Sequence, residues 1–221
     1  MTLALSPAFD NACGVQNPTE SSFPARRLGV LMVVSGPSGS GKTTLCRQLA
    51  DMGEGVHSVS ATTRAPRPGE VHGEHYFFFS EAEFNVRLQN GEFFEHARVH
   101  GNLYGTLKSQ VKQNLERGVD VIMDIDVQGA ALVRASDDEM IRRCHTDVFI
   151  LPEDMDSLKE RLSNRGTEAA DTLELRLKNA LTEIAHWQEY DYALVSGSRE
   201  SDLERFRAIL LTERMRVGRF L

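Results

Sequence analysis

The stretch VLMVVSGPSGSGKTTL, residues 30–45, organises the rest of the chain. Its five apolar residues 30–34 predict a buried strand, a glycine-rich turn follows them, and residues 42–50 predict the first turns of a helix. The turn fits the pattern G-x-x-x-x-G-K-[ST] in the strand–loop–helix context that the pattern needs. The four residues that match it are Gly36, Gly41, Lys42 and Thr43. The sequence therefore predicts a phosphate-binding loop in a nucleotide-binding protein.

The residue types of this loop suit phosphate oxygens. Glycine permits backbone conformations that a Cβ forbids, so successive N–H groups can turn inward around a phosphate. The helix N-terminus adds a partial positive charge, Lys42 adds a full one, and the Thr43 hydroxyl can hold Mg²⁺. An ordinary Gly/Ser turn is the alternative, and the flanking strand and helix favour the phosphate loop over it.

The composition indicates a single soluble globular domain. The chain has 221 residues, of which 41% are hydrophobic and 26% are charged. Its formal net charge of −7 argues against a non-specific nucleic-acid binder. The three cysteines are odd in number and widely spaced, which does not fit a disulfide framework and favours a reducing compartment. We therefore expect a cytoplasmic protein.

We interpret the first residues of the chain as a tail and not as a targeting peptide. Residues 1–27 mix Ser, Pro, Asn and Thr and predict a loose tail, because their one apolar run is too short for a signal peptide. No stretch approaches the roughly 18 apolar residues of a membrane span, so we expect no membrane partner. Arginines near both ends are interpreted as solvated. They are Arg26, Arg27, Arg214, Arg216 and Arg219.

Strand and helix patterns alternate along most of the chain. Buried-strand patterns at 119–124, 148–152 and 192–195 are separated by helical patterns and predict a parallel α/β sheet flanked by helices. The stretch 60–106 is richer in short strands and predicts an inserted substrate-binding lobe. The seven histidines show no H-E-x-x-H or Cys/His spacing, so structural zinc is not expected. No G-x-S-x-G, H-R-D or D-F-G motif is present.

Two further features carry charge suited to phosphate chemistry. Arg64 and Arg67 lie three positions apart in a Pro/Gly-rich loop, and they either clamp one phosphate through paired hydrogen bonds or form a solvated basic loop. Asp124 ends a buried strand, where P-loop folds place the acid that holds the Mg²⁺ shell. Asp126 follows two residues later, so in extended backbone both carboxylates face the same side.

Five runs of sequence together resemble a known family, guanylate kinase, in the family's order and spacing over residues 28–217. The runs are GPSGSGKTTL, SVSATTRAPRPGEVHGEHYFF, GEFFEHARVHGNLYGT, DIDVQG and ERLSNRGTE. The resemblance implies a P-loop NTPase core, an inserted mixed α+β GMP-binding lobe and a helical lid. It also implies transfer of the ATP γ-phosphoryl group to GMP or dGMP. The implied division is a core at 28–58, 107–152 and 178–217, a lobe at 59–106 and a lid at 153–177, with tails at 1–27 and 218–221.

The resemblance also assigns site residues. ATP is expected at Gly36, Pro37, Ser38, Gly39, Ser40, Gly41, Lys42, Thr43 and Thr44. GMP is expected at Ser60, Arg64, Arg67, Tyr76, Glu95, Tyr104, Thr106 and Asp126. Mg²⁺ is expected at Thr43 and Asp124. The expected catalytic residues, which stabilise charge on the phosphates, are Lys42, Arg64, Arg161, Arg165 and Arg176.

The residue types explain how guanine is selected. Guanine offers O6 and N7 as acceptors and N1–H and N2–H as donors. The Glu95 carboxylate can accept from both donors, while the hydroxyls of Ser60 and Thr106 can donate to O6 or N7. Adenine lacks those donors and leaves a buried Glu95 unpaired, so such a site can reject it by about four to five powers of ten.

Two other functions share parts of this sequence. A ribosyl bisphosphate kinase on the same scaffold explains the phosphate loop, but Glu95, Ser60 and Thr106 favour a guanine pocket over a bare sugar phosphate. A guanylate-kinase-like scaffold domain that binds phosphopeptides typically lacks a complete P-loop and the lid arginines, and this chain has both. The sequence leaves open whether the protein is a monomer or a homo-oligomer.

The chain departs from the family pattern after its final strand. Guanylate kinases commonly carry Asn-Asp-Asp there, with the Asn amide near the adenine of ATP, whereas residues 196–198 of this chain are Ser-Gly-Ser. Ser196 is shorter and has one rotatable hydroxyl in place of an amide that donates and accepts at once. We therefore expect ATP to remain the donor, with weak discrimination against GTP.

Overall fold

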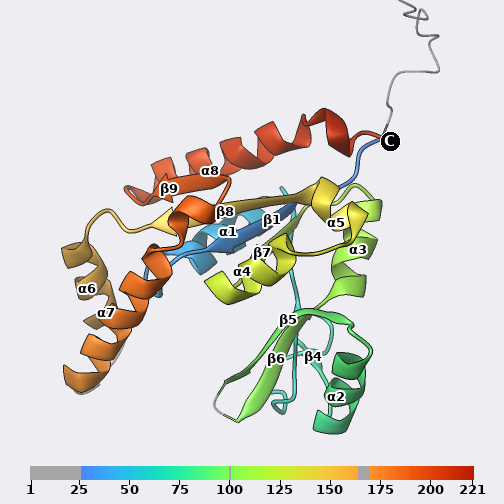
Figure 1. Cartoon of the computed structure of the whole chain (residues 1–221), viewed down its shortest axis with the longest axis horizontal. Helices are drawn as coiled ribbons and strands as arrows, with labels where there is room; N and C mark the ends of the chain where they lie inside the picture. The colour runs from blue at the N-terminus through green and yellow to red at the C-terminus, as the bar shows by residue number, and fades with distance from the viewer. Residues whose placement is uncertain (1–25, 100, 164–169) are drawn as a thin grey trace, which may run out of the picture.

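The structure is a computed structural model that describes residues 26–99, 101–163 and 170–221 (Figure 1). Its centre is a five-stranded sheet in the order β2-β7-β1-β8-β9, and every neighbouring pair is parallel. The strands are β1 (Leu31–Ser35), β2 (Val56–His57), β7 (Val121–Asp124), β8 (His145–Leu151) and β9 (Tyr192–Val195). The predicted parallel sheet is confirmed.

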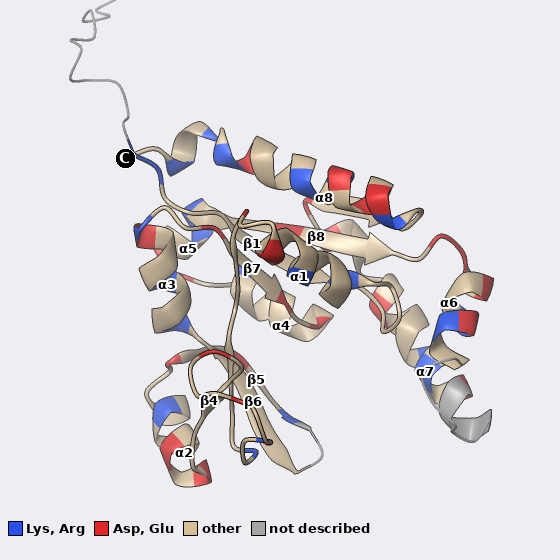
Figure 2. Ribbon diagram, turned by 180° about the vertical axis from the view of Figure 1, so that it is seen from behind, with Lys and Arg blue, Asp and Glu red and all other residues tan. Residues whose placement is uncertain are grey.

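Helices cover both faces of this sheet, as the continuous apolar run of β1 requires. Met32 and Val34 face one layer, where α1 (Lys42–Asp51) and α8 (Arg199–Arg214) pack. Leu31 and Val33 face the opposite layer. The helices of that layer are α3 (Lys108–Glu116), α4 (Val127–Arg134) and α5 (Glu139–Cys144). Charged residues of both signs are spread along α8, as Figure 2 shows.

The inserted lobe lies below the central sheet in Figure 1 and has its own sheet. Its strand order is β4-β3-β6-β5, with mixed parallel and antiparallel pairing. The elements are β3 (Ser60–Thr62), β4 (Phe77–Phe78), α2 (Glu81–Gln89), β5 (Phe93–Val99) and β6 (Asn102–Leu107). Phe84 of α2 stacks on Phe93 with ring centroids 4.4 Å apart, in a small core separate from that of the main sheet.

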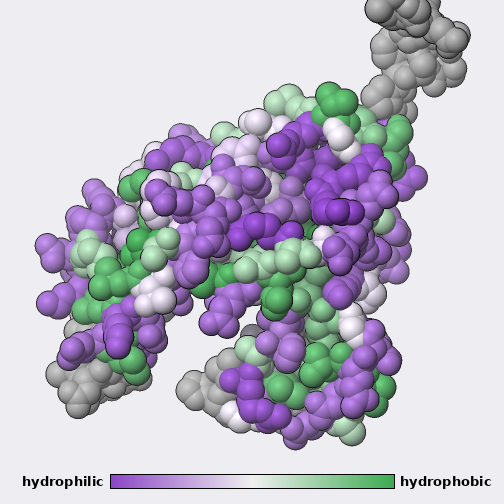
Figure 3. Space-filling view, in the orientation of Figure 1, coloured by the Kyte–Doolittle hydropathy of each residue, from purple (hydrophilic) through white to green (hydrophobic). Residues whose placement is uncertain are grey.

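A helical arm forms the other wall of a wide hollow, seen between the arm and the lobe in Figure 3. It consists of α6 (Met155–Ser163) and α7 (Ala170–Ile184), which pack through Leu158, Leu162 and Ala180. A short 3₁₀ helix, η2 (Trp187–Glu189), then leads into β9.

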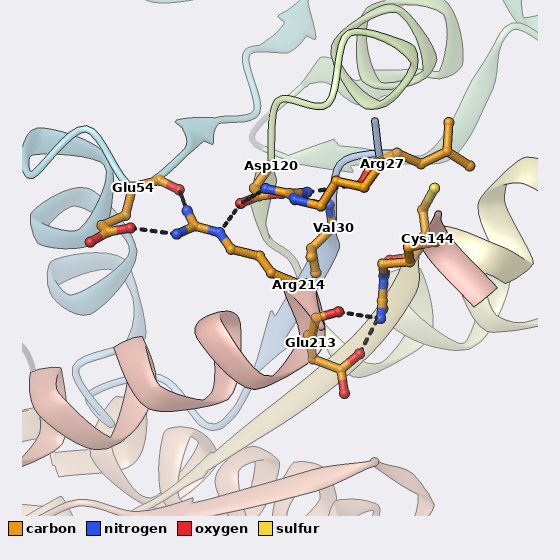
Figure 4. A network of polar contacts seen from close by, with 9 residues as sticks. Arg27, Val30, Glu54, Asp120, Cys144, Glu213 and Arg214 are labelled. Carbon is orange, nitrogen blue, oxygen red and sulfur yellow. Dashed lines mark hydrogen bonds and ion pairs between the residues drawn. The ribbon is translucent and has the colours of Figure 1, made fainter. Parts of the chain in front are cut away.

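The arginines near the chain ends are mostly paired, so the prediction that they are solvated is wrong for three of them (Figure 4). Asp120, which is buried, accepts from Arg27 at 2.7 Å and from Arg214 at 2.6 Å. Arg219 lies in the 3₁₀ helix η3 (Val217–Arg219), is 1% exposed and pairs with the buried Glu213 at 2.6 Å. The expectation overlooked the two Asp120 contacts because they join residues 93 and 94 positions apart in the sequence, and it overlooked the Arg219–Glu213 pair because that pair forms only when the chain end folds back onto α8. Arg216 is exposed, as expected.

Candidate active site

The predicted phosphate loop runs from the end of β1 to the start of α1. Gly36 has a φ of 149°, and a Cβ there would lie 2.5 Å from the carbonyl oxygen of Ile150. Glycine is therefore required at this position both by conformation and by space. The Lys42 side chain folds back over the loop, with Nζ 3.4 Å from the Pro37 carbonyl oxygen. The loop and the lysine thus enclose one small region at the N-terminus of α1.

A pair of side-chain oxygens, from Thr43 and Asp124, lies beside this loop. The Thr43 hydroxyl donates to Oδ2 of Asp124 at 2.5 Å. The two residues meet because Asp124 ends β7, which pairs with β1, and Thr43 lies at the start of the helix that follows β1. Among the described residues, no group of three or more His, Cys, Asp or Glu side chains is arranged to hold a metal ion. A Mg²⁺ ion at this pair therefore needs further oxygen ligands from phosphates and water, which is the usual arrangement for Mg²⁺.

The residues expected to contact guanine come together on the lobe. Ser60 and Thr106 are cross-strand partners on β3 and β6, and Thr106 donates its hydroxyl to Oε1 of Glu95 on β5 at 2.8 Å. Burial raises the pKa of the Glu95 carboxyl, the Thr106 hydrogen bond opposes this shift, and the nearby Asp126 carboxylate adds to it. Asp126 is the N-cap of α4, where its carboxylate accepts from the backbone N–H of Gly129.

The arginine loop of the lobe is organised by a residue that sequence reasoning missed. Both terminal nitrogens of Arg64 donate to Glu70, at 2.8 and 2.9 Å, and the backbone N–H of Arg67 donates to the same carboxylate. The Arg64 side chain holds the pKa of Glu70 at about 2. Glu70 lies only six residues after Arg64 in the same loop, so the closeness of two opposite charges in the sequence was the signal that could have predicted this salt bridge.

The same loop borders a cavity of about 640 Å³ between the lobe and α1. The Arg64 guanidinium lies 5.4 Å from the centre of the Tyr76 ring, and Tyr76 meets Tyr104 edge to face. Arg47 of α1 lines the cavity from the core side and was not among the expected site residues. The cavity therefore combines arginines with tyrosine hydroxyls, a lining suited to a phosphate monoester.

A second cavity, of about 390 Å³, lies on the other side of the phosphate loop and is called the donor cavity below. Thr44 and Gln48 of α1 line it, together with Arg161 of α6. Ser196 and Gly197, at the end of β9, form another part of its wall. The structure thus brings a predicted lid arginine and the departing Ser-Gly-Ser segment to one cavity.

The helical arm carries further charged residues, of which Glu183 lies near the phosphate loop. Arg176 is half-buried on α7, whereas Arg165 falls outside the described residues. Glu183, near the end of α7, was not predicted. Burial raises the pKa of its carboxyl, although Lys42 and the backbone N–H of Ser38 favour the ionised form. Glu183 is far from the phosphate loop in the sequence, so nothing in the sequence indicated that the two lie close together in the fold.

Comparisons with known proteins agree on one family. The guanylate kinase family model matches residues 29–213. A guanylate kinase of Ruegeria pomeroyi is 43% identical over 191 residues, covering 86% of this chain and 88% of that protein. One from Maricaulis maris is 46% identical over 196 residues, covering 88% of each. The crystal structure of guanylate kinase from Anaplasma phagocytophilum superposes with a TM-score of 0.66 at 35% identity, covering 89% of this chain and 92% of that one.

Proposed function

The chain belongs to the guanylate kinase family and phosphorylates GMP to GDP, and we propose that ATP supplies the phosphoryl group from the phosphate loop while GMP or dGMP accepts it from the lobe. The observation that carries this placement is the Glu95 carboxylate, partly buried and oriented by Thr106. A buried carboxylate needs hydrogen-bond donors. Guanine N1–H and N2–H are two adjacent donors that match its acceptor oxygens.

The two nucleotides are polyanions, so the reaction mainly demands positive charge that brings them together. Lys42 and the N-terminus of α1 serve the β- and γ-phosphates of the donor. Arg64 and Arg67, on the wall of the larger cavity, serve the acceptor phosphate. We assign the remaining charge on the transferred group to three arginines of the arm, Arg161, Arg165 and Arg176.

The acceptor needs no general base. The second pKa of a phosphate monoester is near 6, so the attacking oxygen is already largely ionised at pH 7. The protein therefore contributes positioning and electrostatic stabilisation and is not required to remove a proton. Closure of the arm and the lobe over the hollow excludes water, which would otherwise compete as the acceptor.

Mg²⁺ fits the oxygen pair beside the phosphate loop. Thr43 and Asp124 would hold it, since hydroxyl and carboxylate oxygens are the ligands that this ion prefers. When bound, Mg²⁺ neutralises charge on the β- and γ-phosphate oxygens. The Thr43–Asp124 hydrogen bond keeps both oxygens close together in its absence.

The proposed division of labour follows the architecture. The core at 28–58, 107–152 and 178–217 binds the donor, the lobe at 59–106 binds the acceptor, and the lid at 153–177 covers both. No helix in the described part of the chain is long and apolar enough to cross a membrane. Cys46 and Cys144 are buried free thiols, which supports the proposed cytoplasmic location.

The test is an ADP-release assay with ATP and Mg²⁺ across GMP, dGMP, AMP, UMP and CMP. We expect turnover with GMP and dGMP and a kcat/KM for AMP lower by about four powers of ten. Comparable turnover with AMP would refute the guanine assignment of the Glu95 site. Turnover that does not depend on Mg²⁺ would refute the role of the Thr43–Asp124 pair.

A further inference from the structure

The donor cavity has a wall whose polar groups already bind one another. The Ser196 hydroxyl donates to Oδ2 of Asp202 at 3.0 Å, and Ser196 is only 5% exposed. The backbone N–H of Gly197 donates to the same carboxylate at 2.9 Å, and Arg205 donates to it at 2.6 Å. Because Asp202 is buried and receives all three, the hydroxyl of Ser196 is committed to it and does not point a donor at the cavity.

The part of the cavity wall that α1 forms contains a polar atom that lacks a hydrogen-bond partner among the described residues. Gln48 lies on α1 four residues after Thr44, so both side chains share the helix face that lines the cavity. The side-chain oxygen Oε1 of Gln48 is buried and has no hydrogen-bond partner within the described part of the chain. A buried acceptor without a donor is unfavourable, and a ligand that supplies the donor removes that penalty.

We propose that Gln48 reads the base of the phosphoryl donor, its side-chain oxygen accepting a hydrogen bond from the exocyclic N6 amine of adenine. This inference rests on the proposed placement of the donor nucleotide at the phosphate loop. Adenine carries an amine donor at position 6, whereas guanine carries the O6 acceptor at the same place. An acceptor on the protein is therefore matched by ATP and opposed by GTP.

The size of the preference follows from the chemistry of the amide. A glutamine can turn its amide over and present the NH₂ group to O6 of guanine, so GTP is disfavoured by no more than about one neutral hydrogen bond. That is worth about 2- to 13-fold in kcat/KM. Gln48 thus supplies a modest preference that Ser196, held by Asp202, does not supply.

The experiment compares three donors with saturating GMP: ATP, GTP and purine riboside triphosphate, which lacks any group at position 6. In the unaltered protein we expect ATP to exceed both others in kcat/KM by about 2- to 13-fold. Gln48→Leu should lower kcat/KM for ATP by that factor and leave the value for purine riboside triphosphate unchanged. Gln48→Glu, which can only accept, should keep the preference for ATP over GTP.

Two controls separate the possible outcomes. Gln113→Leu makes the same change at an exposed position of α3 and should leave all three donors unchanged. Equal losses for all three donors in Gln48→Leu would mean a purely structural role and would overturn the inference, as would an unchanged ATP/GTP ratio. If Gln48→Leu does not fold, the unaltered protein and Gln48→Glu still decide, because equal use of ATP and purine riboside triphosphate refutes the contact. Failure of the unaltered protein to use ATP would instead refute the proposed donor.

Discussion

Thr106 donates its hydroxyl hydrogen to Oε1 of Glu95 across the ladder of β6 and β5, at 2.8 Å. An ionised carboxylate has about four acceptor positions on its two oxygens, so one hydroxyl orients Glu95 without saturating it. The remaining lone pairs need donors because the group is partly buried, and we propose that this need is the physical source of selectivity for guanine.

The first prediction concerns recognition of the acceptor base. Glu95→Gln replaces an acceptor by a group that is half donor, facing two guanine donors. We expect kcat/KM for GMP to fall at least ~100-fold, the cost of a spoiled buried polar match, while the KM for ATP hardly changes. Steady-state kinetics with each nucleotide varied in turn measures both. Normal phosphorylation of GMP would show that the guanine pocket lies elsewhere.

The same substitution should have the opposite effect on stability. Burial raises the pKa of Glu95 above its unfolded value of 4.5, so the folded protein holds the proton more tightly. The contribution of Glu95 to stability is therefore present below pH 4.5 and is lost as the pH rises through the raised pKa. We expect Glu95→Gln to be more stable than the unaltered protein in urea unfolding at pH 7.5, with the difference shrinking toward pH 4.5.

A nearby glutamate gives the matched control for this pH dependence. Asn90 and Arg87 donate to Glu92 and hold its pKa below the usual value. Glu92→Gln should therefore be neutral or destabilising at pH 7.5, with any loss vanishing on acidification. If both variants respond to pH in the same direction, the argument from burial of Glu95 is wrong.

The sequence predicted the strongly patterned elements of the fold, but it did not predict strand β6 or the helices α4 and α5. The run at β1 and the loop after it carry their own signals. Strand β6 contains Gly105, which interrupts the alternation of apolar and polar side chains that predicts a strand. A glycine is needed there, since a Cβ would lie 2.8 Å from the Glu95 carbonyl oxygen. The short helices α4 and α5 were not assigned, since eight and six residues give little periodicity.

Site residues, like the elements of the fold, could be predicted only where the sequence itself carries a pattern. Those within contiguous motifs, such as Lys42 and Thr43, could be chosen from sequence because their spacing is itself the signal. Glu183 and Gln48 could not, because their roles depend on which helix face meets a cavity or the phosphate loop. The pairing of Arg219 with Glu213 likewise depends on how the chain end folds back onto α8 and the start of β8.

Removal of the charge at the phosphate loop should affect catalysis and not folding. Within the described residues the Lys42 ammonium group approaches the Pro37 carbonyl oxygen at 3.4 Å and attracts the Glu183 carboxylate without a salt bridge to it, so Lys42→Met should melt within a few degrees of the unaltered protein. We expect kcat to fall by ~10³ or more, because the positive charge acts where charge develops on the β- and γ-phosphates. Single-turnover kinetics with saturating substrates measures the chemical step.

The control for Lys42 is Lys108, another lysine whose ammonium group contacts a backbone carbonyl, that of Gly91 at 2.8 Å. Lys108→Met removes the same charge far from the loop and should leave kcat within about twofold of the unaltered value. Comparable losses in the two variants would mean that net charge, and not position, determines the rate.

The ion pair at the chain end should be important for stability and not for catalysis. Arg219 and Glu213 are almost fully buried, so Arg219→Met leaves a carboxylate without its main counter-charge. We expect a loss of about 3–5 kcal/mol in the free energy of unfolding, measured in urea. Adding Glu213→Gln should recover most of it, because a glutamine can still accept from the Tyr192 hydroxyl. No recovery in the double variant would assign the loss to the backbone contacts of Arg219.

The Ser196 hydroxyl donates to Asp202 within a buried site, so its removal should affect stability more than the choice of donor nucleotide. Ser196→Ala should leave the ratio of kcat/KM for ATP over GTP within about twofold of the unaltered value and cost about 0.5–1.5 kcal/mol of stability. Ser196→Asn adds an amide that donates and accepts at once, and it should raise that ratio by about 2- to 13-fold. A ratio that falls in Ser196→Ala would show that the serine hydroxyl turns from Asp202 to the base when the donor binds. A ratio unchanged in Ser196→Asn would show that position 196 does not read the donor base, even with an amide in place.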